Sequence, residues 1–182
     1  MCKSKSIRFF LLAFFSLLLL TSCQKEENTF DILVFSTLPD EALEEITELA
    51  KSELPENLEL KVSQYPPVNE RLIVEIVSHA GDILIMDREF LASVYDAKEL
   101  YNLTEFRNEE NTIELTSFEL EALMADGEVT EEVDVYDNAL RVINLDTYYN
   151  ESETIELVAI IPKYIEDKEI AFSIMKKLVL KE

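Results

Sequence analysis

Very few side chains in this sequence have the types and spacing that catalysis requires. His79 is the only histidine, so a His-based acid/base relay and a multi-histidine metal site are both excluded. There is no Gly-x-Ser-x-Gly elbow, and two glycines, Gly81 and Gly127, make no phosphate-binding loop. Paired carboxylates such as Glu109-Glu110 recur throughout, which is typical of a solvated acidic surface. We therefore expect a protein that is not an enzyme and that has no metal or cofactor, with His79 as a polar residue near a helix end.

The first hundred residues alternate between strand-like and helix-like patterns. Residues 31–36 and 82–87 are nearly continuous apolar runs, typical of strands buried on both faces, and residues 58–63 alternate like a strand nearer an edge. Apolar residues at helical spacing follow each run. Thr37 is expected to cap the first helix, which should continue to about Leu54, Asn69 to cap the second, and Gly81 to close it. This β-α-β-α-β-α order predicts a parallel sheet with right-handed crossovers.

Polar side chains follow each of these three strands. Ligands of open parallel sheets bind outside the carboxyl ends of the strands. That edge would present Ser36, Thr37, Tyr65, Asp87 and Arg88, which are able to hydrogen-bond a small solute. Topology therefore places a candidate ligand site here.

The second half of the chain is less regular. Residues 107–137 are expected to form an acidic, loop-rich insert, in which Thr116 and Glu119 have the spacing of a capping box. Residues 138–148 and 155–161 look like two strands, and Asp167 should cap a final amphipathic helix. We predict one α/β domain over residues 31–182, with three layers and a mostly parallel sheet flanked by helices.

The charge balance excludes one class of partner. Sixteen Lys and Arg against 38 Asp and Glu give a net charge of -22. A surface with this much negative charge repels nucleic acid, and we therefore do not expect DNA or RNA binding. The two cysteines, Cys2 and Cys23, both precede the domain, which leaves it without an internal disulfide or a cysteine metal site.

The N-terminal segment has the pattern of an export signal. Lys3, Lys5 and Arg8 precede an apolar run, residues 9–20, that is shorter than the roughly 20 residues of a membrane span. The sequence 20–23, Leu-Thr-Ser-Cys, resembles the lipobox of bacterial lipoproteins. This resemblance implies a signal peptide over residues 1–22, lipid such as palmitate on Cys23, and a tether over residues 23–30. The domain would then lie on the extracytoplasmic face of the cell membrane, or of an outer membrane in a host with two. The alternative is an uncleaved signal anchor with an incidental cysteine.

The order of elements also resembles the first lobe of the extracellular solute-binding proteins of ABC importers, especially the sugar-binding type. The resemblance rests on the strand at 32–36, the segment 81–87 with sequence GDILIMD, and the segment 100–106 with sequence LYNLTEF. Residues 159–163 and 167–178 are similar to the return strand and first-lobe helix of that family. The implied fold is one lobe of a type II periplasmic binding protein.

The chain departs from this family in one respect. Members have two lobes that close over the ligand, whereas only about fifty residues, 107–154, lie where the second lobe would be inserted. We expect a membrane-anchored, solute-binding-protein-like lipoprotein with a non-enzymatic binding role and, as partner, an ABC permease or another envelope protein. The alternative is a structural or interaction lipoprotein of the cell envelope with no small ligand. A surface hydrolase is least expected, because nucleophile and base are both missing.

Overall fold

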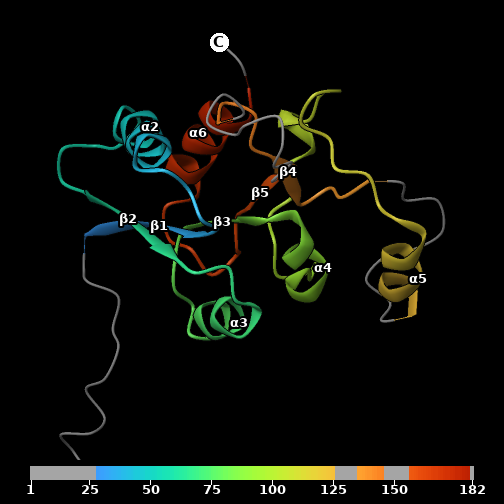
Figure 1. Ribbon diagram of the computed structural model, residues 1–182. Coiled ribbons are helices and arrows are strands. Elements are labelled where there is room, and N and C mark those ends of the chain that lie inside the picture. Colours follow the sequence, from blue (N-terminus) through green and yellow to red (C-terminus); the bar gives the residue numbers. More distant parts are fainter. Residues whose placement is uncertain (1–27, 126–134, 146–155, 181–182) are drawn as a thin grey trace, which may run out of the picture.

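A computed structural model describes residues 28–125, 135–145 and 156–180 of the chain (Figure 1). The proposed signal peptide, the lipobox and Cys23 lie outside these ranges. The elements, in order, are β1 (Thr29–Phe35), α2 (Asp40–Lys51), β2 (Glu59–Tyr65), α3 (Asn69–Val77), β3 (Ile83–Asp87), η1 (Arg88–Phe90), α4 (Leu91–Val94), η2 (Thr104–Phe106), α5 (Ser117–Ala125), β4 (Ala139–Arg141), β5 (Leu157–Ile160) and α6 (Lys168–Val179).

The five described strands form one mixed sheet in the order β2-β1-β3-β5-β4. β1 pairs in parallel with both β2 and β3, as the alternating strand and helix pattern predicts. β5 is antiparallel to β3 and to β4, so it alone runs against the other strands. The expected α/β class with flanking helices is confirmed, and the C-terminal half of the chain returns to the sheet built by the N-terminal half.

Helices cover both faces of the sheet. α2 and α6 lie on one face, and α3 and α4 lie on the other (Figure 1). β1 supplies both cores because successive side chains of a strand point to opposite faces. Ile32 and Val34 pack under α2 and α6, whereas Leu33 and Phe35 pack toward α3 and α4. The apolar run of β1 is therefore buried on both sides, as expected from the sequence.

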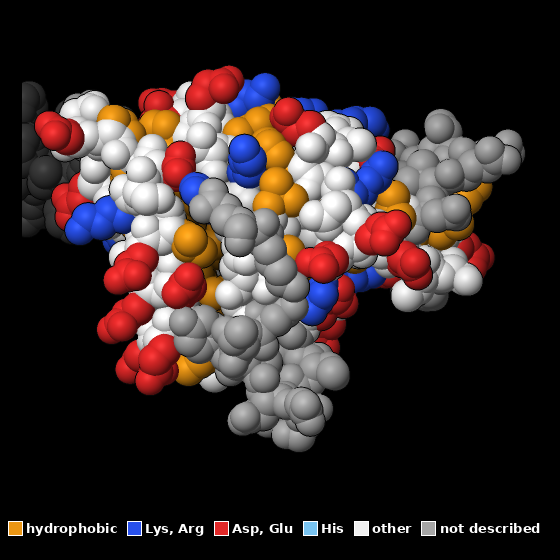
Figure 2. Space-filling model, turned by 90° about the horizontal axis from the view of Figure 1, so that it is seen from above, with side chains coloured by type: hydrophobic (Ala, Val, Ile, Leu, Met, Phe, Trp, Pro, Cys, Tyr) orange, Lys and Arg blue, Asp and Glu red, His pale blue; other side chains and the backbone are white. Residues whose placement is uncertain are grey.

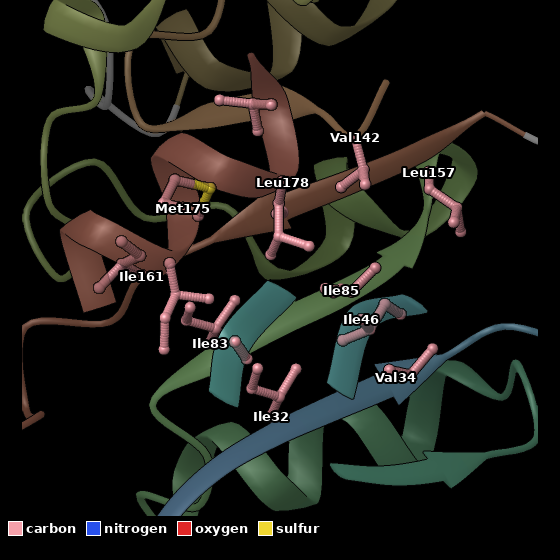
Figure 3. Close-up of a cluster of buried hydrophobic side chains, with 14 of the residues drawn as sticks. Ile32, Val34, Ile46, Ile83, Ile85, Val142, Leu157, Ile161, Met175 and Leu178 are labelled. Atoms are coloured by element: carbon pink, nitrogen blue, oxygen red, sulfur yellow. The ribbon is translucent and has the colours of Figure 1, made fainter. Parts of the chain in front are cut away.

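The larger core lies between the sheet and the pair α2 and α6. Figure 3 shows Ile46 of α2 and Met175 and Leu178 of α6 directed toward Ile83 and Ile85 of β3. All five side chains are fully buried. Each contributes about 1.5–3 kcal/mol relative to an exposed position, so this core is the main stabilising feature of the fold.

Three expected helix ends are wrong. α2 begins at Asp40 with Pro39 as its N-cap, and Thr37 is exposed and outside the helix. The same helix ends at Lys51, before Leu54. Asn69 is the first residue of α3 and caps nothing; its Oδ1 instead accepts a hydrogen bond of 2.6 Å from Ser93.

The second helix also ends before Gly81. α3 stops at Val77, because His79 adopts a left-handed φ of 57° that a helix cannot continue through. At the start of α6, Asp167 is the N-cap residue as expected, although its side chain makes no capping hydrogen bond. The capping box of α5 is confirmed: Thr116 N donates to Glu119 at 2.8 Å, and Glu119 N donates to Thr116 Oγ1 at 3.3 Å.

The strand expected over residues 138–148 is shorter than predicted. β4 covers Ala139–Arg141, and Val142, Ile143 and Leu145 are buried without belonging to the ladder. Val142 N still donates to the Leu157 carbonyl at 2.9 Å, which extends the pairing by one bond. Residues 146–148 lie outside the described ranges.

Acidic side chains are spread over the surface. Figure 2 shows the face that carries α2 and α6, where Asp and Glu side chains are distributed among Lys, Arg and apolar groups. In the described parts of the chain, no helix has the length and apolar character that crossing a bilayer requires. The same residues contain no cluster of three or more His, Cys, Asp or Glu side chains arranged to hold a metal ion.

Candidate binding cleft at the carboxyl end of the third strand

A cleft of about 950 Å³ opens where β3 ends. Asp87 and Arg88 line it, at the sheet edge where topology places a ligand site. Its other walls come from the segment 112–116, from the first turn of α5 and from Glu156, just before β5. Five carboxylates belong to the lining: Asp87, Glu89, Glu114, Glu119 and Glu156.

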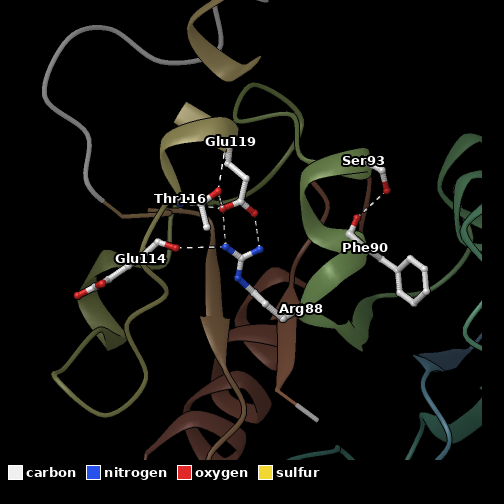
Figure 4. Close-up of polar contacts among 6 residues, drawn as sticks. All are labelled: Arg88, Phe90, Ser93, Glu114, Thr116 and Glu119. Carbon is white, nitrogen blue, oxygen red and sulfur yellow. Dashed lines mark hydrogen bonds and ion pairs between the residues drawn. The ribbon is translucent and has the colours of Figure 1, made fainter. Parts of the chain in front are cut away.

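An ion pair between Arg88 and Glu119 joins two walls of the cleft. The Arg88 guanidinium donates to both carboxylate oxygens of Glu119, at 2.6 and 2.8 Å, and to the Glu114 carbonyl at 3.1 Å (Figure 4). Two parallel charge-assisted bonds fix the relative orientation of the groups. Thr116 completes the shell of Glu119 through its backbone N–H and its hydroxyl, both at 2.8 Å. The pair therefore fastens α5 to the end of β3.

The surroundings of the pair hold both groups in their charged forms. Burial raises the pKa of Glu119, but hydrogen bonds from Arg88 and Thr116 outweigh that effect and lower its pKa to about 2. Burial lowers the pKa of Arg88, yet the hydrogen bond and charge of Glu119 outweigh it, so that pKa is raised. Because the guanidinium already donates hydrogen bonds to Glu119 and Glu114, we do not expect it to bind an anionic ligand.

The ring of Tyr136 lies against the guanidinium of Arg88. The guanidinium carbon lies 5.2 Å from the centre of the Tyr136 ring, within cation–π range. Tyr136 is 1% exposed and packs edge-on against Tyr95, with ring centres 4.6 Å apart. Burial, together with the charge of Glu119, raises the pKa of Tyr136, although the charge of Arg88 lowers it. The tyrosine is thus a neutral aromatic platform.

Three buried polar atoms lack hydrogen-bond partners among the described residues: the Tyr136 hydroxyl and two oxygens at strand ends. The two oxygens at strand ends are Ser36 Oγ, at the end of β1, and Asp87 Oδ1, at the end of β3. Burial raises the pKa of Asp87, and electrostatic interaction with the Ser36 hydroxyl lowers it, with burial the larger effect. The two groups do not have the geometry of a hydrogen bond, so both oxygens are unsatisfied among the described residues. Leaving such a buried group unpaired costs about 1–3 kcal/mol.

The structure brings together only some of the expected site residues. Asp87 and Arg88 line the cleft, and Ser36 lies buried behind Asp87. Thr37 is exposed and is not part of the lining. Tyr65 stacks on Phe35 with ring centres 5.3 Å apart and carries Arg71 on its ring, so it too lies outside the cleft.

Sequence reasoning missed several residues of the cleft. Glu119 was recognisable only as half of a capping box, and Glu156 and Tyr136 carried no signal. Their positions depend on pairing between segments far apart in the chain: Arg88 N donates to the Glu156 carbonyl at 2.8 Å, and Tyr136 N to the Ile113 carbonyl at 3.1 Å. No protein-family model matches this sequence, and no similar sequence was found among curated proteins.

Proposed function

We propose that this chain is a lipid-anchored, extracytoplasmic bacterial protein whose single domain binds a small solute and does not catalyse a reaction. The lipobox-like sequence that ends at Cys23 supports the location. A lipid carried there would hold the domain at the membrane surface without a spanning helix, since buried methylenes contribute about 0.8 kcal/mol each.

The observation that carries the binding role is the unsatisfied pair of oxygens at the strand ends. Asp87 Oδ1 and Ser36 Oγ are buried at the edge where open α/β sheets bind ligands, and Asp87 lines a cleft large enough for a small solute. Because Asp87 lines the cleft, a ligand group that donates hydrogen bonds would meet its carboxylate there. This gives the cleft a physical reason to bind.

The lining also indicates the chemistry of the solute. The carboxylates of Asp87, Glu89 and Glu156 accept hydrogen bonds, whereas Arg88 is already engaged. A solute rich in donors, such as a polyol, a sugar or an amine, therefore fits better than an anion. The cleft lies open at the end of the sheet, so we expect modest affinity.

The course of the chain supports the resemblance to one lobe of a type II periplasmic binding protein. β5 and α6 come from the last quarter of the sequence, and they join β3 and α2 in the same sheet and core. This is the arrangement that the similarity of residues 159–163 and 167–178 implies. We propose that the domain is a reduced relative of that family, and that its partner is an ABC permease or another envelope protein.

A structural or interaction role is the second candidate, and one observation favours it. Four of the five exposed large apolar side chains in the described ranges belong to the α3 region, and the fifth is Met124 of α5. Those of the α3 region are Val68, Ile73, Val74 and Val77, with Val77 75% exposed. Such an apolar surface is typical of a protein contact.

Thermal denaturation of the chain from Gln24 onward, which contains every described element, tests the binding role. A panel of sugars, polyols, amino acids, amines and metal ions would be screened for a rise in the unfolding midpoint. We expect a donor-rich solute to raise the midpoint of the wild type and not of Asp87→Ala. Glu41→Gln, on the exposed surface of α2, is the matched control and should respond like the wild type. No shift with any solute, together with a crosslinked partner that is lost in Val74→Asp, would replace the first role by the second.

A further inference from the structure

A second cavity, of about 400 Å³, lies near the amino end of β3, whereas the cleft lies at its carboxyl end. Leu84 and Ile160, which line it, face each other across β3 and β5 at the amino end of β3, whereas Asp87 faces Leu157 at the other end. Side chains from α3 and from the segment 94–100 complete its walls. Most of the lining is apolar, and the volume falls within the range of small-molecule sites, about 300–1,000 Å³.

One wall of this cavity is aromatic. The His79 ring stacks on Tyr164 with ring centres 4.6 Å apart and an interplanar angle of 14°. The Tyr164 hydroxyl donates to the Ala80 carbonyl at 2.7 Å, and His79 is held in its left-handed conformation at the end of α3. The stacked pair is thus positioned from both ends, and it presents ring surface to the cavity.

The charged groups of the lining are negative. Asp96 and Glu99 line the cavity, and its lining contains no Lys or Arg among the residues that the structure describes. Burial raises the pKa of Tyr164, and the negative charges of Asp82 and Glu75 raise it further. Glu75 also forms an ion pair with Arg71, so part of its charge is compensated.

The side chain of Lys163, which follows the lining residue Pro162, is engaged elsewhere. Lys163 Nζ donates to the Lys98 carbonyl at 2.5 Å, and Lys163 lines a different cleft together with Lys168. Asp96 is held in place by a hydrogen bond of 2.8 Å from the backbone N–H of Lys98 to its Oδ1. The cavity therefore combines apolar walls, an aromatic face and two carboxylates at one place.

We propose that this cavity binds a small organic cation: an apolar body, aromatic or branched, that carries one ammonium group. The apolar walls would bury the body, while the ammonium would lie near Asp96 and Glu99 and beside the His79 and Tyr164 rings. A neutral analogue keeps only the burial, and an anionic analogue meets carboxylates of its own sign. Charge should therefore decide the order of affinity at constant shape.

Three probes of matched shape test this: 2-phenylethylammonium, 2-phenylethanol and 3-phenylpropanoate. Each would be titrated into the chain from Gln24 onward, and binding followed by amide shifts in ¹H–¹⁵N spectra. We expect the ammonium to bind with a millimolar or lower Kd and at least about tenfold more tightly than the alcohol, and the carboxylate not to bind. The shifted amides should belong to residues of the cavity, such as Leu84, Leu100 and Tyr164.

Two sets of variants separate charge from apolar contact. Asp96→Asn with Glu99→Gln should bring the affinity for the ammonium down to that for the alcohol, whereas Glu89→Gln, in the first cleft, should leave it unchanged. Val77→Ser should weaken the binding of both probes alike, and Val74→Ser, on α3 outside the lining, should weaken the binding of neither.

Three results would each overturn the proposal: equal affinities for ammonium and alcohol, shifts centred on Asp87 and Arg88, or no binding up to about 10 mM. Because the cavity shares no residue with the cleft, Asp87→Ala should leave this binding intact.

Discussion

Arg88 and Glu119 meet through two hydrogen bonds of 2.6 and 2.8 Å across a sequence separation of 31 residues. Their side chains are 17% and 9% exposed, so most water is excluded from the pair. Arg88 follows the last residue of β3, and Glu119 lies in the first turn of α5. This bidentate pair, together with the hydrogen bond from Arg88 to the Glu114 carbonyl, connects the acidic insert to the sheet at the candidate cleft (Figure 4).

Glu119→Gln should destabilise the protein by about 1–3 kcal/mol, because Arg88 would keep its charge and lose the carboxylate that compensates it. Urea denaturation measures this change in the free energy of unfolding. Glu121→Gln, exposed in the same helix, should change stability by less than about 0.5 kcal/mol. In a double-mutant cycle with Arg88→Met, zero coupling energy would show that the ion pair contributes nothing to stability.

Acid should weaken the same link over a defined range of pH. The pKa of Glu119 is about 2 in the folded protein, below its ordinary value of 4.5. A carboxyl whose pKa falls on folding stabilises fully above the unfolded pKa, and that contribution is lost as the pH falls through the folded pKa. The wild type should therefore lose its advantage over Glu119→Gln between about pH 4.5 and pH 2. A difference in unfolding free energy that stays constant over this range would contradict the assignment.

Gly81→Ala should be destabilising through both backbone and packing. Gly81 has a φ of +81°, and an added Cβ would lie 2.8 Å from Cγ and 2.9 Å from Cδ1 of Leu33. The left-handed conformation alone costs a non-glycine residue about 1–2 kcal/mol. Leu33→Ala removes the two clashing atoms, so the double variant should be less destabilised than the sum of the two single variants. Strict additivity of the unfolding free energies would show that the contact with Leu33 does not matter.

Ser36→Ala should leave stability unchanged or raise it by up to about 1 kcal/mol, because it removes a buried hydroxyl that has no hydrogen-bond partner among the described residues. Thermal and urea denaturation both report this effect. Ser63→Ala, at a partly exposed position of β2, is the control and should be near neutral. A loss of more than about 1 kcal/mol at Ser36 alone would show that its hydroxyl is already satisfied and would weaken the case for a ligand there.

The sequence predicts those parts of the fold that depend on local patterns. Continuous apolar runs identified β1 and β3, and the spacing of Thr116 and Glu119 identified the N-terminus of α5. Burial of Val142, Ile143 and Leu145 was recognisable, but strand pairing was not, because an apolar pattern reports burial and not hydrogen bonding. The Pro39 N-cap was missed because Thr37 has the better capping side chain in isolation, whereas Ala42 N and Leu43 N bond to the Pro39 carbonyl.

Only those residues of the candidate site that lie at strand ends could be predicted, because the strand order alone fixes where they lie. The ends of β1 and β3 are neighbours because the strands pair in parallel, which brought Ser36 and Asp87 together. Tyr65 ends the neighbouring strand β2, but its ring stacks on Phe35 and contacts Arg71. Glu119 and Tyr136 reach Arg88 through the long insert, and no pattern in the sequence reports contacts made at that range.

The proposed location of the protein rests on Cys23, and labelling with an alkyne-bearing fatty acid in a bacterial host tests it most directly. The wild-type chain and Cys2→Ser should incorporate the label and sediment with membranes. Cys23→Ser should remain unlabelled and keep the mobility of the uncleaved precursor. Labelling of Cys23→Ser to the level of the wild type would contradict the lipid anchor and, with it, the proposed extracytoplasmic role.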